Sequence, residues 1–274
     1  LYPEGHPYHH PVIGSHEDLQ AATVDDVKAF FDRFYLPNNA SLVVAGDIDR
    51  ARIKEVIETY FGALPAGEVP KAPPGEVPKL TSVVRATLPD DVELPKVVMA
   101  WHSPARFTPG DAELDLASVI LEQGKSSRLY KALVYDHPLA QEVSASQSSQ
   151  DLSSSFTIEA IAQPGVDLAK LEAAIDAEVA RLRGEPVSAE ELLRAKNQFE
   201  TGFVSRIQSI AARADLLNRY QTYVGDPGYI EKDLERYRSV TPASLQATVK
   251  SVLDPEARVI LRVVPKDSAP EKAP

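Results

Sequence analysis

"TVDDVKAFFDRFYLPNNASLVVAGD", residues 23–47, shares a pattern with a second stretch of this chain, "TPASLQATVKSVLDPEARVILRVVP" at residues 241–265. Each copy opens with a threonine that can cap a helix, and a proline follows at the same distance in both. Short polar residues then lead into an apolar run that is typical of a buried strand. The alternative is a chance match of cap, stop and strand. If the repeat is genuine, the sequence predicts an α+β fold made from a duplicated unit of helices and a sheet.

The two copies close regions of very different length. The second copy ends a region of about 185 residues (81–265), whereas the first ends one of only about 65 (1–66). We therefore expect an incomplete first domain and a complete second domain. The proline-rich stretch 67–80 is interpreted as a semi-rigid linker, and 266–274 as a disordered tail. Because the chain begins with Leu1 rather than Met, we interpret it as a processed or truncated product.

Hydrophobic periodicity and turn residues predict the remaining elements. Two serine-rich strands, 141–149 and 153–163, are expected to form a hairpin in a sheet with one hydrated face. The other strands are expected over 40–47, 82–88, 95–102 and 257–264. Helices are expected over 23–36, 50–61, 111–123, 126–136, 167–183, 188–224, 227–238 and 242–253.

Composition excludes several classes of protein. The formal net charge is −11 and the sequence pI is about 5.1, which argues against a nucleic-acid partner because phosphate binding requires clustered Lys and Arg. No apolar run approaches the ~20 residues of a membrane-spanning helix. The chain has no cysteine, so it can form neither disulfides nor a Cys-ligated metal site. The remaining composition is typical of a soluble protein, and it leaves cytoplasm and periplasm equally open.

The stretch "GHPYHHPVIGSHEDL" (5–19) raises the question of a metal site. Its prolines interrupt any helix, so its histidines lack a fixed mutual geometry, and no acidic second shell is evident. We interpret them as exposed turn residues, with a weak adventitious metal site as the alternative. The four histidines are His6, His9, His10 and His16.

Residues 2–49 resemble the second part of the N-terminal domain of the M16 zinc peptidases, the family of pitrilysin, insulysin and mitochondrial processing peptidase. The resemblance is carried by the GHPY turn, by the T-x-D-D helix start and by PNNASLVVAGD. A second segment, "GKSSRLYKAL" (124–133), resembles part of the family's C-terminal domain. The resemblance implies two homologous metalloprotease-like α+β domains that enclose an unfolded peptide.

In that family, zinc binds an inverted H-x-x-E-H helix and a downstream Glu in the N-terminal domain. No H-x-x-E-H occurs in this sequence, and the family's zinc ligands lie upstream of the GHPY turn. The resemblance therefore implies no catalytic residue, no metal ligand and no cofactor in this chain. Zinc is implied for an upstream half or for a partner subunit.

The family's C-terminal domain also contributes an Arg and a Tyr that hold the substrate carbonyl. Val134 and Gln141 occupy those positions here, and Tyr135 is a substitute only by proximity. We expect substrate binding at Tyr135 and Gln141, where the Gln141 amide can donate a hydrogen bond. Arg128 and Tyr130 have the wrong spacing, and we interpret them as packing residues.

Two functional hypotheses remain, with an unrelated α+β enzyme as a third. The first is the C-terminal portion of an M16-type zinc peptidase, inactive alone, which binds unfolded peptides as an added strand beside the hairpin 141–163. The second is a non-catalytic M16-like subunit or scaffold that pairs with a zinc-bearing subunit. Both allow a homodimer or heterodimer.

Overall fold

The computed structural model describes residues 1–73 and 77–266. These residues form two compact units. One unit contains residues 1–3, 77–200 and 234–266, and the other contains 4–73 and 201–233. Within the described residues, no helix is both long and apolar enough to cross a membrane.

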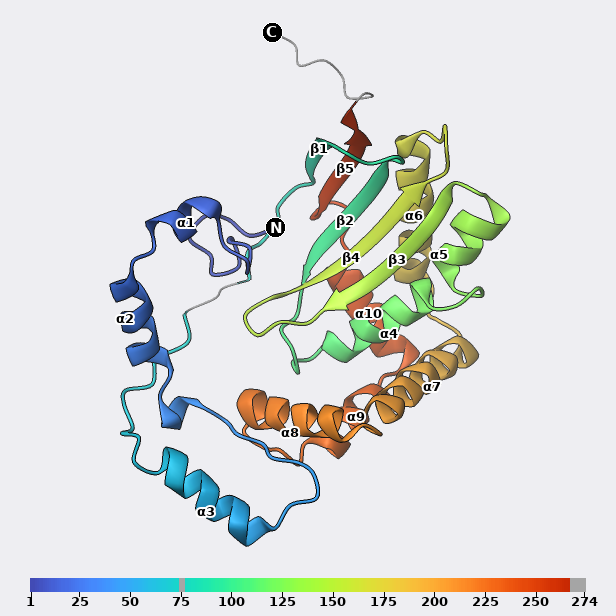
Figure 1. Ribbon diagram of the computed structural model, residues 1–274. Helices are drawn as coiled ribbons and strands as arrows, with labels where there is room; N and C mark the ends of the chain where they lie inside the picture. Colours follow the sequence, from blue (N-terminus) through green and yellow to red (C-terminus); the bar gives the residue numbers. More distant parts are fainter. Residues whose placement is uncertain (74–76, 267–274) are drawn as a thin grey trace. The chain divides into compact units, whose positions relative to one another are not determined.

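The first unit is built on a mixed five-stranded sheet with the strand order β1-β5-β2-β4-β3 (Figure 1). β1 and β5 are parallel, whereas each of the other neighbouring pairs is antiparallel. The expected hairpin is confirmed, since β3 pairs with β4. The strands are β1 (Val84–Asp90), β2 (Lys96–Ser103), β3 (Ala140–Ser148), β4 (Ser154–Ala162) and β5 (Val259–Pro265).

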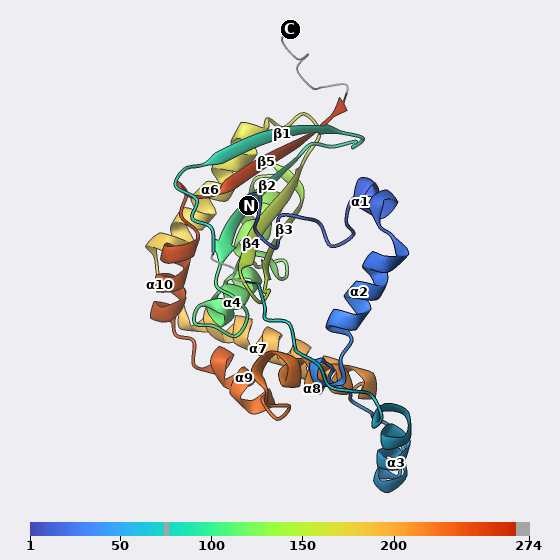
Figure 2. The ribbon, with the colours of Figure 1, turned by 90° about the vertical axis from the view of Figure 1, so that its left-hand side faces the viewer.

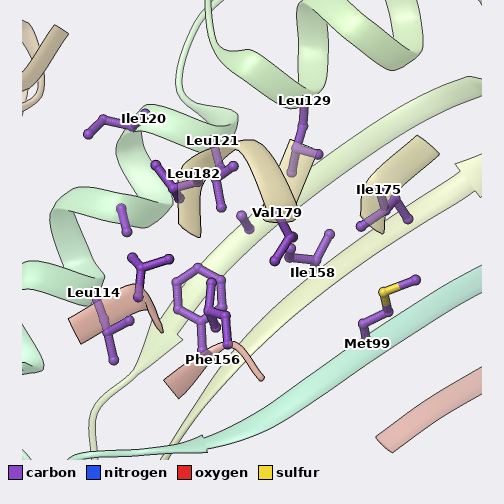
Figure 3. Packing of buried hydrophobic residues seen from close by; sticks show 14 of the residues in the cluster. Met99, Leu114, Ile120, Leu121, Leu129, Phe156, Ile158, Ile175, Val179 and Leu182 are labelled. Atoms are coloured by element: carbon purple, nitrogen blue, oxygen red, sulfur yellow. The ribbon is translucent and has the colours of Figure 1, made fainter. Parts of the chain in front are cut away.

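Three helices cover one face of this sheet: α4 (Asp111–Glu122), α6 (Leu168–Gly184) and α10 (Pro242–Val252). Figure 2 shows α6 and α10 on the same side of the strands. Side chains alternate along β4 between buried and half-buried, as expected for a strand with a single covered face. Burial of apolar surface against the helices supplies the main stabilisation. Members of this core include Met99, Leu114, Leu121, Phe156, Ile158, Ile175 and Val179 (Figure 3).

Ion pairs connect the sheet to α6. The buried Glu172 accepts hydrogen bonds from Arg85 on β1, at 2.8 Å, and from Arg262 on β5. Burial opposes ionisation of Glu172, but the hydrogen bonds from both arginines outweigh it and lower the pKa of this carboxyl. Arg258, just before β5, pairs in the same way with Asp176.

The second unit contains α1 (His16–Ala21), α2 (Val24–Phe34), a 3₁₀ turn η1 (Pro37–Asn39), α3 (Arg50–Phe61) and α8 (Ile210–Val224). None of the residues in α1, α2 and α3 is buried. Large apolar side chains on α2, including Phe30 and Phe31, are about half exposed at 52% and 49%. The first unit therefore has a well-filled core, whereas these helices of the second unit do not contribute to one.

α2 and α10 confirm the two capped helices of the sequence repeat. Thr23 forms a capping box with Asp26, and Thr241 forms one with Ser244. Each helix has 11 residues, and the residue after each has nearly the same backbone conformation, φ −90° and ψ 60° at Tyr35 and φ −86° and ψ 52° at Leu253. The two sequences therefore fold locally in the same way.

The strand expected over 40–47 is wrong. These residues have no helix or strand, and Leu42 and Val44 are 60% and 40% exposed. The last copy of the repeat does form a strand, β5, because β1 and β2 flank it and satisfy its backbone groups. Within the described residues, no such neighbour pairs with 40–47.

Three helix predictions need correction. The expected helix 188–224 is broken at residues 207–209 into α7 (Ala189–Arg206) and α8. The expected helix 126–136 is a short α-helix, α5 (Arg128–Tyr130), followed by a π-helix, η2 (Lys131–Asp136). The final helix before α10 is α9 (Ile230–Arg238), three residues shorter at its start than expected.

The described parts of the linker, 67–73 and 77–80, contain no helix or strand. The first residue of this stretch is fixed in place, because the Asn38 side chain donates to the Gly67 carbonyl at 2.8 Å and accepts from the Gly67 amide at 3.1 Å. Residues 74–76 of the linker and 267–274 of the tail lie outside the described residues.

Candidate functional site

The predicted substrate-binding residues, Tyr135 and Gln141, lie in a segment that consists of α5, η2 and the first residues of β3. Leu129 and Leu133 are fully buried and fix this short helical stretch against the core. Its last turn is wide: the amide of His137 donates to the carbonyl of Ala132, five residues back, at 3.2 Å. The amide of Leu139 then donates to the Leu133 carbonyl at 2.9 Å, which folds the chain back toward β3.

Arg128 is held by an ion pair. Its guanidinium donates two hydrogen bonds of 2.8 Å to the Glu191 carboxylate on α7, and the two side chains are only 14% and 17% exposed. The hydrogen bond from Arg128 lowers the pKa of Glu191, against the opposing effect of burial. The Glu191 amide, at the start of α7, donates to the Ser188 hydroxyl at 3.1 Å.

Tyr135 and Gln141 lie on either side of the fold-back. Tyr135, in η2, is 78% exposed, whereas its neighbour Val134 packs against the core. Gln141 is the extra residue of a β-bulge, because Ala140 pairs with Ala162 and Glu142 already pairs with Ile161. Bulges re-aim a side chain and are common beside functional sites. Both side chains are thus accessible to a ligand, and their role in binding one stays a prediction.

Two carboxylates meet near this bulge. Glu122, at the end of α4, has a pKa raised first by burial and then by repulsion from Glu142 on β3. A carboxyl group with a raised pKa can act as a general acid. The structure supplies no second element of a hydrolytic site here, such as an activated nucleophile, among the residues that it describes.

The four N-terminal histidines belong to the second unit. The His6 Nδ1 accepts a hydrogen bond of 3.0 Å from the Tyr8 amide, and the rings of His9 and His10 meet edge to face at 5.1 Å. Across the chain outside 74–76 and 267–274, no three His, Asp or Glu side chains gather closely enough to hold a metal ion.

The second face of the five-stranded sheet is not covered by α4, α6 or α10. On β4 and β3 this face carries short hydroxyl side chains, in the neighbouring pairs Ser146–Thr157 and Ser148–Ser155. His102 extends the Ser148–Ser155 row onto β2, where it pairs with Ser155. One end of this face of the sheet therefore carries hydroxyl groups and an imidazole.

The first residues of the chain lie on this end of the sheet. The His102 Nε2 donates to the Leu1 carbonyl at 2.8 Å, and the Tyr2 ring meets the His102 ring edge to face at 5.2 Å. The Tyr2 hydroxyl lies 3.2 Å from the Oγ of Ser153, 3.3 Å from its carbonyl oxygen and 3.5 Å from that of Ser154. Ser153 and Ser154 are fully buried.

A comparison with protein-family models matches residues 21–199 to the peptidase M16 inactive domain. The chain belongs to the M16 peptidase family. The match includes most of the first unit's sheet and helices and also α2 and α3 of the second unit. The M16 resemblance read from the sequence is thereby confirmed.

Among curated M16 relatives, the zinc protease PqqE of Helicobacter pylori is 29% identical over 221 residues, which are 78% of this chain and 49% of that protein. Among solved structures, a protease from Helicobacter pylori aligns with a TM-score of 0.83 and 24% identity over 92% of this chain and 62% of its own. A chain of complex III2 from Candida albicans aligns with a TM-score of 0.78 and 16% identity, over 93% of this chain and 62% of its own. The chain spans about half the length of the curated relatives it matches.

Sequence reasoning missed the contacts of Tyr2 with His102 and Ser153. Residues so distant along the chain meet only through the sheet topology, and no local M16 motif connects them. The ion pair of Arg128 and Glu191 was missed as well, because the sequence pattern assigned Arg128 a packing role and the two residues are far apart along the chain.

Proposed function

We propose that this chain is the C-terminal portion of an M16-type zinc metallopeptidase and that it binds unfolded peptides without carrying the zinc site. In this proposal residues 81–265 are a complete, non-zinc M16 domain, 67–80 are the linker, and 1–66 are the C-terminal part of the zinc-type domain. Zinc and the H-x-x-E-H motif come from an upstream half or from a partner subunit.

The observation that carries the proposal is the difference between two equally capped helices. α10 buries its apolar face against α4, α6 and β2, whereas α2 leaves Val27, Phe31 and Tyr35 exposed. Exposed apolar surface of this kind marks a binding face. The face of α2 is therefore expected to be covered by the helices and sheet of the remaining part of a zinc-type domain, as α10 is covered in the other domain.

Peptide binding is assigned to the outer edge of β3. Natural edge strands usually carry Lys, Pro or other features that prevent pairing. The opposite edge strand, β1, contains Arg85 and Pro89. In β3 the bulge at Gln141 and the charged Glu142 lie at the first residues, and residues 143–148 carry no charge and no Pro. An extended peptide could add to β3 through main-chain hydrogen bonds, with Gln141 and Tyr135 beside it.

The proposal is tested by measuring zinc content and peptide cleavage for the chain alone and mixed with a separately produced M16 half that carries H-x-x-E-H. We expect neither zinc nor cleavage from the chain alone, and both from the mixture. A zinc content near one per chain, with cleavage by the chain alone, would overturn the proposal.

Two variants test, in the same assay, whether activation of the mixture depends on the apolar face of α2. Phe31→Asp places a charge on the exposed apolar face of α2 and should abolish activation of the mixture. Asp32→Ala, a neighbouring exposed position on the same helix, is the matched control and should leave activation unchanged.

A non-catalytic subunit role is the second candidate. It is favoured by Val134, an apolar and partly buried residue where the family resemblance implies an arginine. The fold is also found in a chain of complex III2, a multi-chain assembly. If the preceding coding sequence or the partner subunit carries only a degenerate H-x-x-E-H, this second role replaces the first.

A further inference from the structure

We draw no further inference here: the strongest candidate, the apolar patch on the sheet face opposite α4, α6 and α10, where the half-exposed Val84 and Leu88 of β1 lie beside Leu261 of β5, carries none because nothing among the described residues shows what covers it.

Discussion

α2 and α10 have the same caps, the same length and nearly the same final backbone angles, yet their apolar faces differ completely. The fourth, eighth and twelfth residues after Thr241 are 0% exposed, whereas those after Thr23 are 51%, 49% and 68% exposed. The same capped helix is therefore present in two different settings, and the burial of its apolar face depends on what packs against it. The compared residues are Leu245, Val249 and Leu253 in α10, and Val27, Phe31 and Tyr35 near α2.

The segments after the two helices differ as well. β5 is flanked by β1 and β2 and is tied to α6 by Arg258 and Arg262. The equivalent positions in the first copy are Ala40 and Val44, which cannot form ion pairs. At these two positions the first copy therefore has no counterpart to the arginines that connect the β5 segment to α6.

The largest expected difference between the two copies is in the loss of unfolding free energy when an apolar side chain of the helix is shortened to alanine. Leu245→Ala should lower the free energy of unfolding by about 2–5 kcal/mol, because it leaves a cavity in the core. Val27→Ala, at the matching position, should change it by less than about 0.5 kcal/mol. Chemical denaturation followed by circular dichroism measures both. A similar cost for the two would contradict the exposed state of α2.

The ion pairs of β5 should give the next largest effect. Arg262→Ala removes one of the two arginines at Glu172 and should cost roughly 1–2 kcal/mol, since part of this side chain is exposed to solvent. Val44→Ala at the equivalent position should cost almost nothing in the chain alone. Urea unfolding of both variants measures these costs. An unchanged unfolding midpoint for Arg262→Ala would show that Arg85 alone is enough to stabilise the ionised Glu172.

The same pair predicts a pH dependence. The two arginines lower the pKa of Glu172 below its ordinary value of 4.5, so its ionised form stabilises the fold above about pH 4.5. That contribution is lost as the pH falls through the lowered pKa. The difference in stability between wild type and Glu172→Gln should therefore be largest near pH 7 and shrink toward about pH 3. A difference independent of pH would argue against an ionised Glu172.

The smallest expected effect concerns the caps. Thr241→Ala should lower the stability of the first unit by about 1 kcal/mol, because the Ser244 amide loses its acceptor. Thr23→Ala should reduce only the local helicity of α2, without moving the main unfolding transition. Residue-resolved helicity from NMR shifts separates the two outcomes, and a common shift of the main transition would show that α2 is part of the same cooperative unit.

Sequence predicted those features that depend on local chemistry or on a repeated pattern. The capped helix at Thr23, the serine-rich hairpin and the M16 resemblance are examples. It failed where a partner decides the outcome: 40–47 has strand residues but no neighbouring strand. The wide turn of η2 and the contacts of Tyr2 could not be predicted either, because both depend on residues that meet only in the folded chain.

The most direct test of the comparison is hydrogen exchange of the backbone amides at residues 42–45 and 260–263, in the chain alone and after addition of the zinc-bearing M16 half. We predict that 260–263 are protected in both conditions and that 42–45 exchange freely alone and become protected in the mixture. Free exchange of 42–45 in a mixture that binds zinc and cleaves peptide would contradict the proposal that these residues complete the zinc-type domain.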